Sequence, residues 1–546
     1  MLTPEYLDKL PDRVVTLYAE LEIRILEDMA RRIVKMDKLT DTAQWQLWKL
    51  EQIGMEREFI QYHLERLTGK TQGEINALLE EAGEQALYFD DQIYREAGLS
   101  PQAVKNSEAL QRVINAGMKK TMRLFQNLTG TTANTATRQF ENALDAAYMD
   151  VFSGAFSYQE AIKRAVKTLS SSGIDAIQYP TGHVDKMDVA VRRAVLTGVN
   201  QTAAEIQIAR ADEMGCDLVE TTAHLGARPS HAVWQGKVFS RSGNSKNYPP
   251  FSETGYGTGA GLCGWNCRHS FFPFFEGISR RAYSRHELSE LSRRSVTYQG
   301  KNLTYYEATQ EQRNMERKIR KWKREYMALD AAGLDTSEAS SRLSMWRARQ
   351  KDFLEKTGLM EDTFRSQVEG FGRSQAAKAR SLAEKKYQNW MQEIGAKNSF
   401  PKTLAKYYQE KYNNTPAYEL LKKYAKDIEN GWVSPNVGFA QYKKVYQFIE
   451  ENIIGRKTSN GILIKGQSDH FIQRVCGTMT DPEKLEKELK IVRRSGIEIE
   501  DVLEALTNGI ARPVKYTHGK PSQLFLNEKC AVSINPDTGI LIQCNK

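Results

Sequence analysis

A helical periodicity in the apolar residues constrains the fold of this chain more than any other feature. Its first example is a stripe of residues three or four positions apart: Val14, Tyr18, Leu21, Ile25, Met29 and Ile33. This spacing places all six on one face of a helix. Similar periodicity runs through residues 1–215 and returns at 284–395. We therefore predict that these two stretches form one mostly helical body.

Three local patterns predict where helices begin or break. Thr71 and Glu74 have the spacing of a capping box, which starts a helix, and Ser284 and Glu287 repeat that spacing. The polar sequence TGTTANTATR, at residues 129–138, favours a flexible break or cap.

The periodicity disappears between residues 216 and 283. Glycine, proline, histidine and aromatic residues concentrate there, which favours short strands joined by long turns. We predict a Gly/Cys/His-rich insert of strands and loops, packed on the helical body.

The helical stretch 284–395 is basic. The sequence RNMERKIRKWKREYM carries seven Lys or Arg residues, at positions 313, 317, 318, 320, 321, 323 and 324. A solvated helix face is the favoured interpretation, and contact with nucleic acid or another acidic partner is the alternative. The net charge of +9, from 77 basic and 68 acidic residues, permits nucleic-acid contact without establishing it.

The C-terminal part of the chain predicts a tether and a separate small domain. Residues 396–459 resemble a tether with some helix, and 460–466 (NGILIKG) a strand. Three short helices are expected at 468–477, 481–496 and 497–509, followed by alternating strands and turns. Helices followed by an antiparallel meander are typical of an α+β domain, here 460–546. The predicted fold class is a mostly α, multidomain protein.

Composition also limits the cellular setting. Six cysteines in 546 residues are too few for a disulfide scaffold, so we expect a reducing compartment. No run of 18 apolar residues is present, so no membrane span is expected. The first residues, MLTPEYLDKLPDRVV, lack the order of a signal peptide, and no leader is expected.

The stretch ARPSHAVWQGKVF, followed by YPPF and TGYGTGAGLCGWNCRHSFFPFFEGIS, resembles the minor capsid proteins of tailed phages, in the group related to the phage Mu F head-morphogenesis protein. The resemblance to this family extends to three further segments: the opening residues, the later stretch DDQIYREAGL, and YYEATQEQRNMERKIRKWKRE. It therefore covers roughly residues 1–375. It implies a low-copy protein inside the phage head, made in the bacterial host cytoplasm, whose partners are portal and capsid proteins. A role in head assembly or DNA delivery is implied as well.

The C-terminal domain more loosely resembles the barnase, EndoU, colicin and RelE-like nucleases. That resemblance implies an RNase effector that uses no metal, with His470 and Arg474 as the first candidates because residues four apart share a helix face. The other candidates for acid–base or phosphate contacts are His518, Lys465, Lys515, Lys520, Thr517 and Ser522. The alternative is a purely structural protein whose last domain only binds DNA or the portal, so enzymatic activity stays open; DNA and RNA are both candidate partners of the protein.

The sequence GLCGWNCRHSFFPFFEG, residues 261–277, permits three interpretations. A zinc site would use Cys263, Cys267 and His269, with His224 or His231 as the fourth ligand. A disulfide or redox role is weaker, because no C-x-x-C pair is present. The favoured interpretation is a structural clasp of buried thiols and phenylalanines, with no cofactor. Arg228, Trp234 and Gln235 are likewise interpreted as structural.

Overall fold

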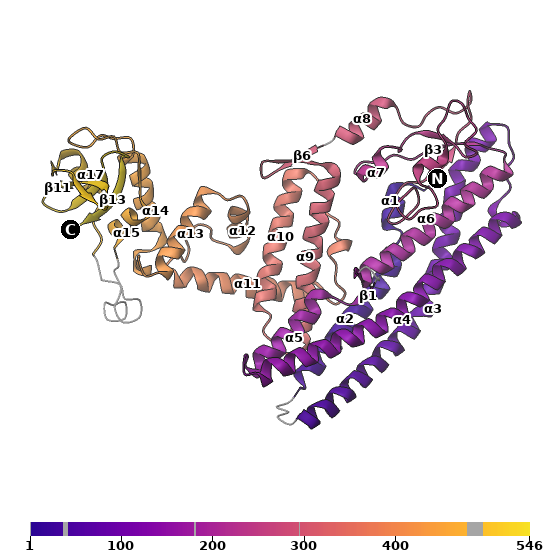
Figure 1. Cartoon of the computed structure of the whole chain (residues 1–546), viewed down its shortest axis with the longest axis horizontal. Helices are drawn as coiled ribbons and strands as arrows, with labels where there is room; N and C mark the ends of the chain where they lie inside the picture. The colour runs from indigo at the N-terminus through magenta and orange to yellow at the C-terminus, as the bar shows by residue number, and fades with distance from the viewer. Residues whose placement is uncertain (1, 37–41, 179–181, 294, 478–494) are drawn as a thin grey trace. The chain divides into compact units, whose positions relative to one another are not determined.

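The computed structural model describes residues 2–36, 42–178, 182–293, 295–477 and 495–546. The chain divides into two compact units, Met1–Ala379 and Arg380–Lys546. Helix α11 (Arg373–Glu393) carries the chain from the first unit into the second (Figure 1). In the described part of the chain, no helix has both the length and the apolarity needed to cross a bilayer.

The first unit consists mainly of long helices, as the periodicity predicted (Figure 1). The long helices are α2 (Asp12–Val34), α3 (Thr42–Glu96), α4 (Glu108–Phe152), α5 (Tyr158–Ser172), α6 (Met187–Glu213), α9 (Tyr305–Ala331) and α10 (Ser337–Thr357). The short ones are α1 (Pro4–Lys9), α7 (Pro229–Ala232) and α8 (Arg285–Arg293). Short 3-10 turns lie at Val104–Asn106, Phe251–Thr254 and Phe364–Ser366. The stripe predicted on α2 is buried at all six positions and packs against α3, α5, α6 and α9.

Two of the predicted helix interruptions are wrong. Thr71 lies in the middle of α3, where its hydroxyl donates to the carbonyl of Leu67 at 2.9 Å. Residues 129–138 continue α4 without a break, and Thr132 makes the same kind of bond to Leu128. A threonine hydroxyl bonded one turn back is compatible with a helix interior, so polarity alone did not mark an end. At Ser284 the predicted capping box is present, because Glu287 accepts from the Ser284 amide at 2.7 Å.

The insert has the predicted strands and loops. Strands β3 (Leu218–Thr221), β4 (Val238–Ser240) and β5 (Phe271–Pro273) form an antiparallel sheet in the order β4-β3-β5. Two hairpins that the sequence analysis did not predict lie within the helical stretches: β1 (Asp175–Gln178) with β2 (Val184–Lys186), and β6 (Ser295–Tyr298) with β7 (Lys301–Thr304).

The basic run on α9 is only partly a solvated face. Arg317 and Lys318 are exposed, but Arg320, Lys323 and Arg324 are buried. Helix α9 packs against α2 and α5, which turns this side of the run inward.

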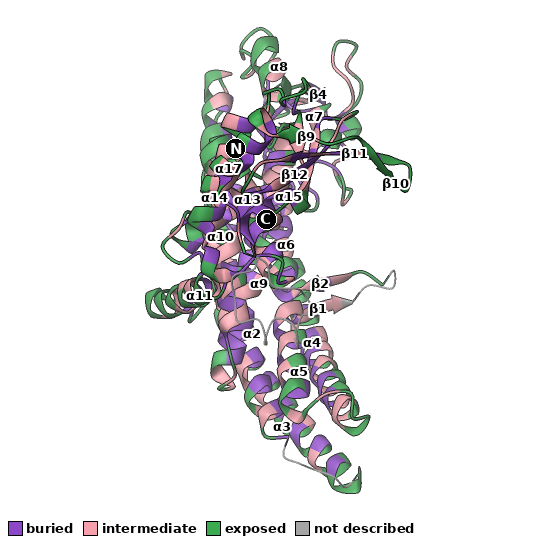
Figure 2. Ribbon diagram, turned by 90° about the vertical axis from the view of Figure 1, so that its left-hand side faces the viewer, coloured by how far each residue is buried: buried purple, intermediate pink, exposed green. Residues whose placement is uncertain are grey.

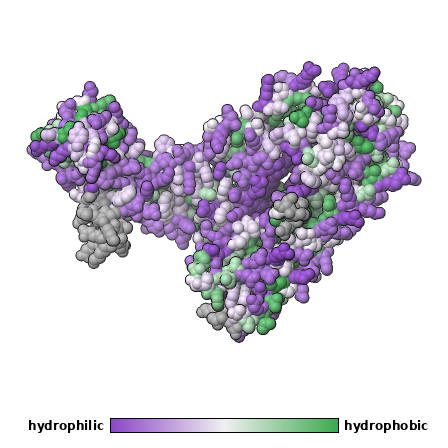
Figure 3. Space-filling model, viewed as in Figure 1, coloured by the Kyte–Doolittle hydropathy of each residue, from purple (hydrophilic) through white to green (hydrophobic). Residues whose placement is uncertain are grey.

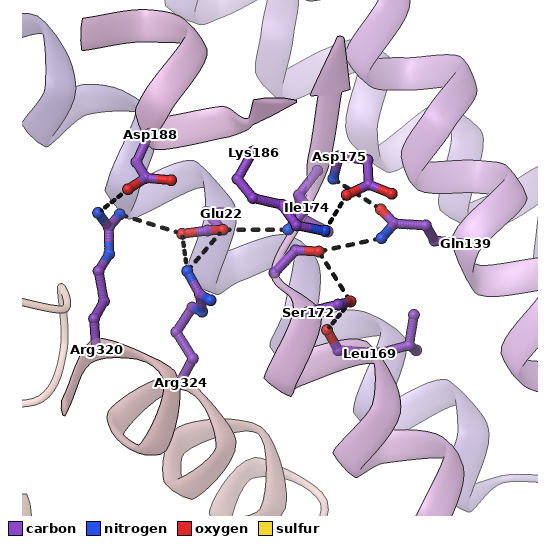
Figure 4. A network of polar contacts seen from close by, with 11 residues as sticks. Glu22, Gln139, Leu169, Ser172, Ile174, Asp175, Lys186, Asp188, Arg320 and Arg324 are labelled. Atoms are coloured by element: carbon purple, nitrogen blue, oxygen red, sulfur yellow. Dashed lines mark hydrogen bonds and ion pairs between the residues drawn. The ribbon is translucent and has the colours of Figure 1, made fainter. Parts of the chain in front are cut away.

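Two of the buried arginines meet acids from distant parts of the chain (Figure 4). Glu22 on α2 accepts from Arg320 at 3.4 Å and from Arg324 at 3.3 Å, and Asp188 on α6 pairs with Arg320 at 2.5 Å. Glu22 also accepts from the amide of Ile174 at 3.2 Å. Burial acts to raise the pKa of Asp188, but the guanidinium groups of Arg320 and Arg324 bring it below its ordinary value. These charges join three helices.

The second unit begins with helices where a tether was expected. Residues 396–459 contain α12 (Leu404–Tyr412), α13 (Pro416–Glu429), α14 (Phe439–Phe448), a 3-10 turn at Pro435–Val437 and a π-helical turn at Ile449–Ile453. Leu421 on α13 and Tyr442 on α14 are buried. This stretch is therefore a packed helical layer of the unit.

The C-terminal module has the predicted order of helices and strands. Helix α15 (Asp469–Cys476) and helix α17 (Ile499–Asn508) precede an antiparallel meander. The strands are β8 (Gly466–Gln467), β9 (Ile510–Ala511), β10 (Lys515–Thr517), β11 (Lys520–Leu526), β12 (Ala531–Asn535) and β13 (Ile540–Asn545). Their order is β10-β11-β12-β13-β8, with β8 parallel to β13 and β9 paired to β11. The helix expected at 481–496 falls mostly outside the described residues.

Candidate functional site

Two segments of the insert bring a histidine–cysteine–histidine cluster together. His231 lies on α7, and Cys267 and His269 lie in the loop that enters β5. All three side chains are buried, with exposed fractions of 2% or less. Cys267 belongs to an apolar core that also contains Trp234, Phe271 and other buried residues.

A close approach between two loop backbones shapes this part of the insert. A Cβ at Gly261 would lie 2.0 Å from the carbonyl oxygen of Gly255, so only glycine fits at that position. The chain then turns at Cys263, whose φ of 57° is in the left-handed region. This folded loop delivers Cys267 and His269 to the side of α7.

Three ligand-type atoms of the cluster face one another. The Cys267 Sγ lies 3.7 Å from the His231 Nδ1 and 3.6 Å from the His269 Nδ1, and the two Nδ1 atoms are 3.4 Å apart. The outer nitrogens are held by acceptors: His231 Nε2 lies 2.8 Å from the carbonyl of Ala260, and His269 Nε2 lies 3.2 Å from Gln235 Oε1.

Burial also sets the protonation of these groups. It lowers the pKa of His231 to about 4 and that of His269 to about 2, so both imidazoles are neutral at neutral pH. Burial raises the pKa of the Cys267 thiol, which favours the protonated thiol in the metal-free cluster. Neutral imidazole is the form that binds a metal ion.

The cluster borders a cavity of about 700 Å³. His224, His231, Cys267 and His269 line one part of it. Other lining residues carry guanidinium groups from several elements: Arg193, Arg228, Arg268, Arg313 and Arg365. Asp8 pairs with both Arg268 and Arg365 at 2.7 Å, so part of this charge is balanced inside the protein.

The structure brings together three of the five residues considered as zinc ligands, His231, Cys267 and His269. Cys263 is buried, but its Sγ lies 3.5 Å from the carbonyl of His269 and outside the group of facing ligand atoms. The His224 ring lies against that of His269, with centroids 4.3 Å apart, and its Nδ1 faces the carbonyl of Leu225. All six cysteines are free thiols, so Cys263 and Cys267 form no disulfide.

In the C-terminal module, the predicted pair His470 and Arg474 is present on α15. Both side chains share one face, and the Arg474 Nε donates to the His470 Nε2 at 3.0 Å. His470 is exposed, and α15 packs against β13. The backbone amide of Lys465 bonds to Gly539 at 2.8 Å, and its side chain is exposed.

A network of buried side chains contacts His470 through Gln473. The His470 Nδ1 lies 3.3 Å from Gln473 Oε1, and the Gln473 amide donates to Asp427 at 2.8 Å. Asp427 also accepts from the Tyr442 hydroxyl at 2.8 Å. Because Gln473 donates through its nitrogen, its oxygen is left to accept from Nδ1–H. The contacts of Arg474 and Gln473 together define one tautomer of His470.

The other predicted site residues lie elsewhere in the module. Lys515 pairs with Ser522 across the β10–β11 hairpin, and His518 occupies its turn with a φ of 49°. Figure 2 shows β10 and the turn of this hairpin exposed and projecting from the sheet. Four strand intervals separate β10 from β8, roughly 19 Å at about 4.8 Å each. The strand order therefore predicts that the hairpin residues lie apart from His470 and Arg474, because α15 packs against β13, three strand intervals from β10.

Comparison with known proteins decides what kind of chain this is. The family described as Phage minor capsid protein 2 matches residues 2–355, which is more than half of the sequence. The chain belongs to this family.

Two relatives of this minor capsid protein agree with the assignment. A structural protein of Lactococcus phage LL-H is 26% identical over 216 residues, 38% of this chain and 55% of the relative. A structural protein of Lactococcus phage mv4 is 32% identical over 104 residues, 19% of this chain and 76% of the relative. The match thus spans about half the length of the LL-H protein. No solved structure matches the chain.

The minor capsid family match includes the insert and α9 but none of the C-terminal module. The cluster of His231, Cys267 and His269 therefore lies within the family region, residues 2–355, and His470 lies outside it. The sequence carried no signal for Asp427 and Tyr442, which support His470 through Gln473. An isolated Asp or Tyr in a helix carries no signal of such a role, because its partners come from other elements.

Proposed function

We propose that this minor capsid protein is a low-copy component of the phage head that binds the portal through its helical unit. The proposal rests on family membership and on the resemblance of residues 1–375 to Mu F-like head-morphogenesis proteins. It places the protein inside the virion, in contact with portal and capsid proteins.

Exposed apolar side chains at one end of the first unit support an assembly contact. Leu47 and Leu50 near the start of α3 are 71% and 62% exposed, and Met149 and Phe152 near the end of α4 are 58% and 68% exposed. Trp45 stacks on Tyr148 with centroids 4.7 Å apart, which joins these helix ends. Figure 3 shows apolar side chains where α3 begins and α4 ends. Grouped exposed apolar side chains often mark protein interfaces.

The test uses phage carrying Leu47→Lys and Phe152→Lys together. We expect this variant to be depleted from purified heads, and the wild-type protein to cross-link to the portal. Ile278→Lys is the control, since Ile278 is also exposed but lies in the insert and not on α3 or α4. Normal heads from a deletion phage, with no protein detected in wild-type heads, would overturn the proposal.

We also propose that the C-terminal module cuts RNA, with His470 as the proton-transfer group. The observation that favours this is an exposed imidazole beside a cation, on a helix that a buried network holds in place. Arg474 would stabilise the charge that grows on the phosphate, and Lys465, at the base of α15, is the nearest further cation in sequence.

The strand order suggests a matched control for the experiment, because β10 and β8 lie at opposite ends of the order. Purified full-length protein is incubated with cellular RNA in the presence of EDTA. We expect cleavage, reduced about 10²–10⁴-fold by His470→Ala, the usual cost of losing one positioned acid or base. His518→Ala, on the distant hairpin, should cut like wild type. RNA bound but uncut by all three proteins would leave only a binding role for the module.

A further inference from the structure

The spacing of the insert cluster matches a metal coordination shell. With zinc bonds of about 2.05 Å to nitrogen and about 2.3 Å to sulfur, tetrahedral angles require N···N near 3.3 Å and N···S near 3.6 Å. The cluster has 3.4 Å between the two nitrogens, and 3.6 and 3.7 Å from nitrogen to sulfur. The three atoms thus already lie on the corners that one ion would need.

Hydrogen bonds alone do not account for this arrangement. The carbonyl of Ala260 can only accept, so His231 carries its proton on Nε2. Gln235 Oε1 accepts from the backbone amide of His224 at 3.2 Å, which identifies it as the oxygen, so His269 is also protonated on Nε2. Both Nδ1 atoms therefore present lone pairs toward each other, with a single thiol proton between them.

Outer hydrogen bonds of this kind are a regular part of metal sites. A ligating histidine usually donates its other N–H to a carbonyl or a carboxylate, which sets the tautomer and the direction of the ring. Here a backbone carbonyl serves His231 and a side-chain amide serves His269.

We propose that His231 Nδ1, Cys267 Sγ and His269 Nδ1 bind one Zn²⁺ ion. Two imidazoles and one thiolate are a donor set that zinc accepts readily. Among the residues that the structure describes, no further His, Cys, Asp or Glu belongs to this group of facing atoms. A solvent molecule from the adjoining cavity completes the tetrahedron.

The ion would join two parts of the insert that are distant in sequence. Helix α7 supplies one ligand and the loop before β5 supplies two, 36 residues apart in sequence between His231 and Cys267. Its binding energy would therefore contribute to the folding of this insert. The proposal concerns the family region and is independent of RNA cleavage by the C-terminal module.

The first test needs no variant. Full-length protein, purified without a histidine tag, is analysed for metals after dialysis. We expect one zinc ion per chain. After exchange with Co²⁺, we expect the absorption of a tetrahedral ion and a thiolate-to-cobalt charge-transfer band. Metal-free protein that takes up neither Zn²⁺ nor Co²⁺ would overturn the proposal.

Variants then identify the ligands. Cys267→Ser should abolish the charge-transfer band, and Cys267→Ser and His269→Ala should each weaken zinc binding by more than about 100-fold, beyond the cost of losing an outer hydrogen bond. Cys263→Ser is the matched control, because this buried cysteine lies in the same loop but outside the group. Should Cys263→Ser lose the band while Cys267→Ser keeps it, the assigned ligand set is wrong.

Discussion

The two units of the protein place their charged and metal-type side chains differently. The first unit buries them between elements: Glu22 with Arg320 and Arg324, and His231 with Cys267 and His269. The C-terminal module presents most of its candidates to solvent, with His470 on α15 and His518 on the hairpin. Buried polar groups need specific partners, whereas exposed ones are satisfied by water. Buried polar contacts therefore join the elements of the family region, whereas most candidate residues of the C-terminal module are exposed to solvent.

The largest effect is expected from Glu22→Gln. This change leaves Arg320 and Arg324 buried next to a neutral amide, and removing one partner of a buried ion pair costs about 3–5 kcal/mol. Denaturant unfolding of the first unit measures the loss. Glu20→Gln is the control: Glu20 and Arg24 are about half exposed, and such a surface pair is worth less than about 1 kcal/mol. Equal losses in the two variants would contradict the contrast drawn between buried and exposed charges.

Asp427→Ala tests a place where the second unit, like the first, buries a charged side chain. Asp427 is 3% exposed, and burial raises its pKa. Removing it leaves the Tyr442 hydroxyl and the Gln473 amide without an acceptor, at an expected cost of about 1–3 kcal/mol. Thermal unfolding measures that cost. If the network positions His470, RNA cleavage should fall as well, whereas Tyr442→Phe should retain most of it.

Gln235→Ala weakens the support of the insert cluster without removing a ligand. Loss of an outer hydrogen-bond partner typically reduces metal affinity about 10–100-fold. Competition with a chelator measures the change, and the zinc stoichiometry at saturation should stay the same. Gln310→Ala, in a residue that lines the same cavity, should leave the affinity unaltered.

The smallest effect is expected from Lys515→Ala on the projecting hairpin. Lys515 is exposed, so its removal should not shift the midpoint of thermal unfolding. It should also leave RNA cleavage unchanged, because β10 lies four strand intervals from β8. A clear loss of cleavage in this variant would mean that the hairpin and α15 act on the same phosphate.

The sequence alone determined the fold class and part of the order of elements. A three- and four-residue spacing, as on α2, predicts a buried helix face because helix geometry is local. The same reasoning identified the strands of the insert and the helix-then-meander order of the C-terminal module. It failed at Thr71, where a hydroxyl bonded within the helix replaced the expected cap.

Only the tertiary structure decided which polar residues meet. In the sequence, Arg320 and Arg324 belong to a basic run. They are buried because α9 packs on α2, which carries their partner Glu22 about 300 residues earlier in the chain. His231 and His269 were both visible in the sequence, but their facing nitrogens depend on how α7 and the loop before β5 fold together. The contact between His470 and Arg474 could be predicted from helix spacing. The place of His518 relative to this pair depends on the order of the strands, which the sequence does not give. Contacts within one element follow from local geometry, and contacts between elements follow from packing that no short pattern records.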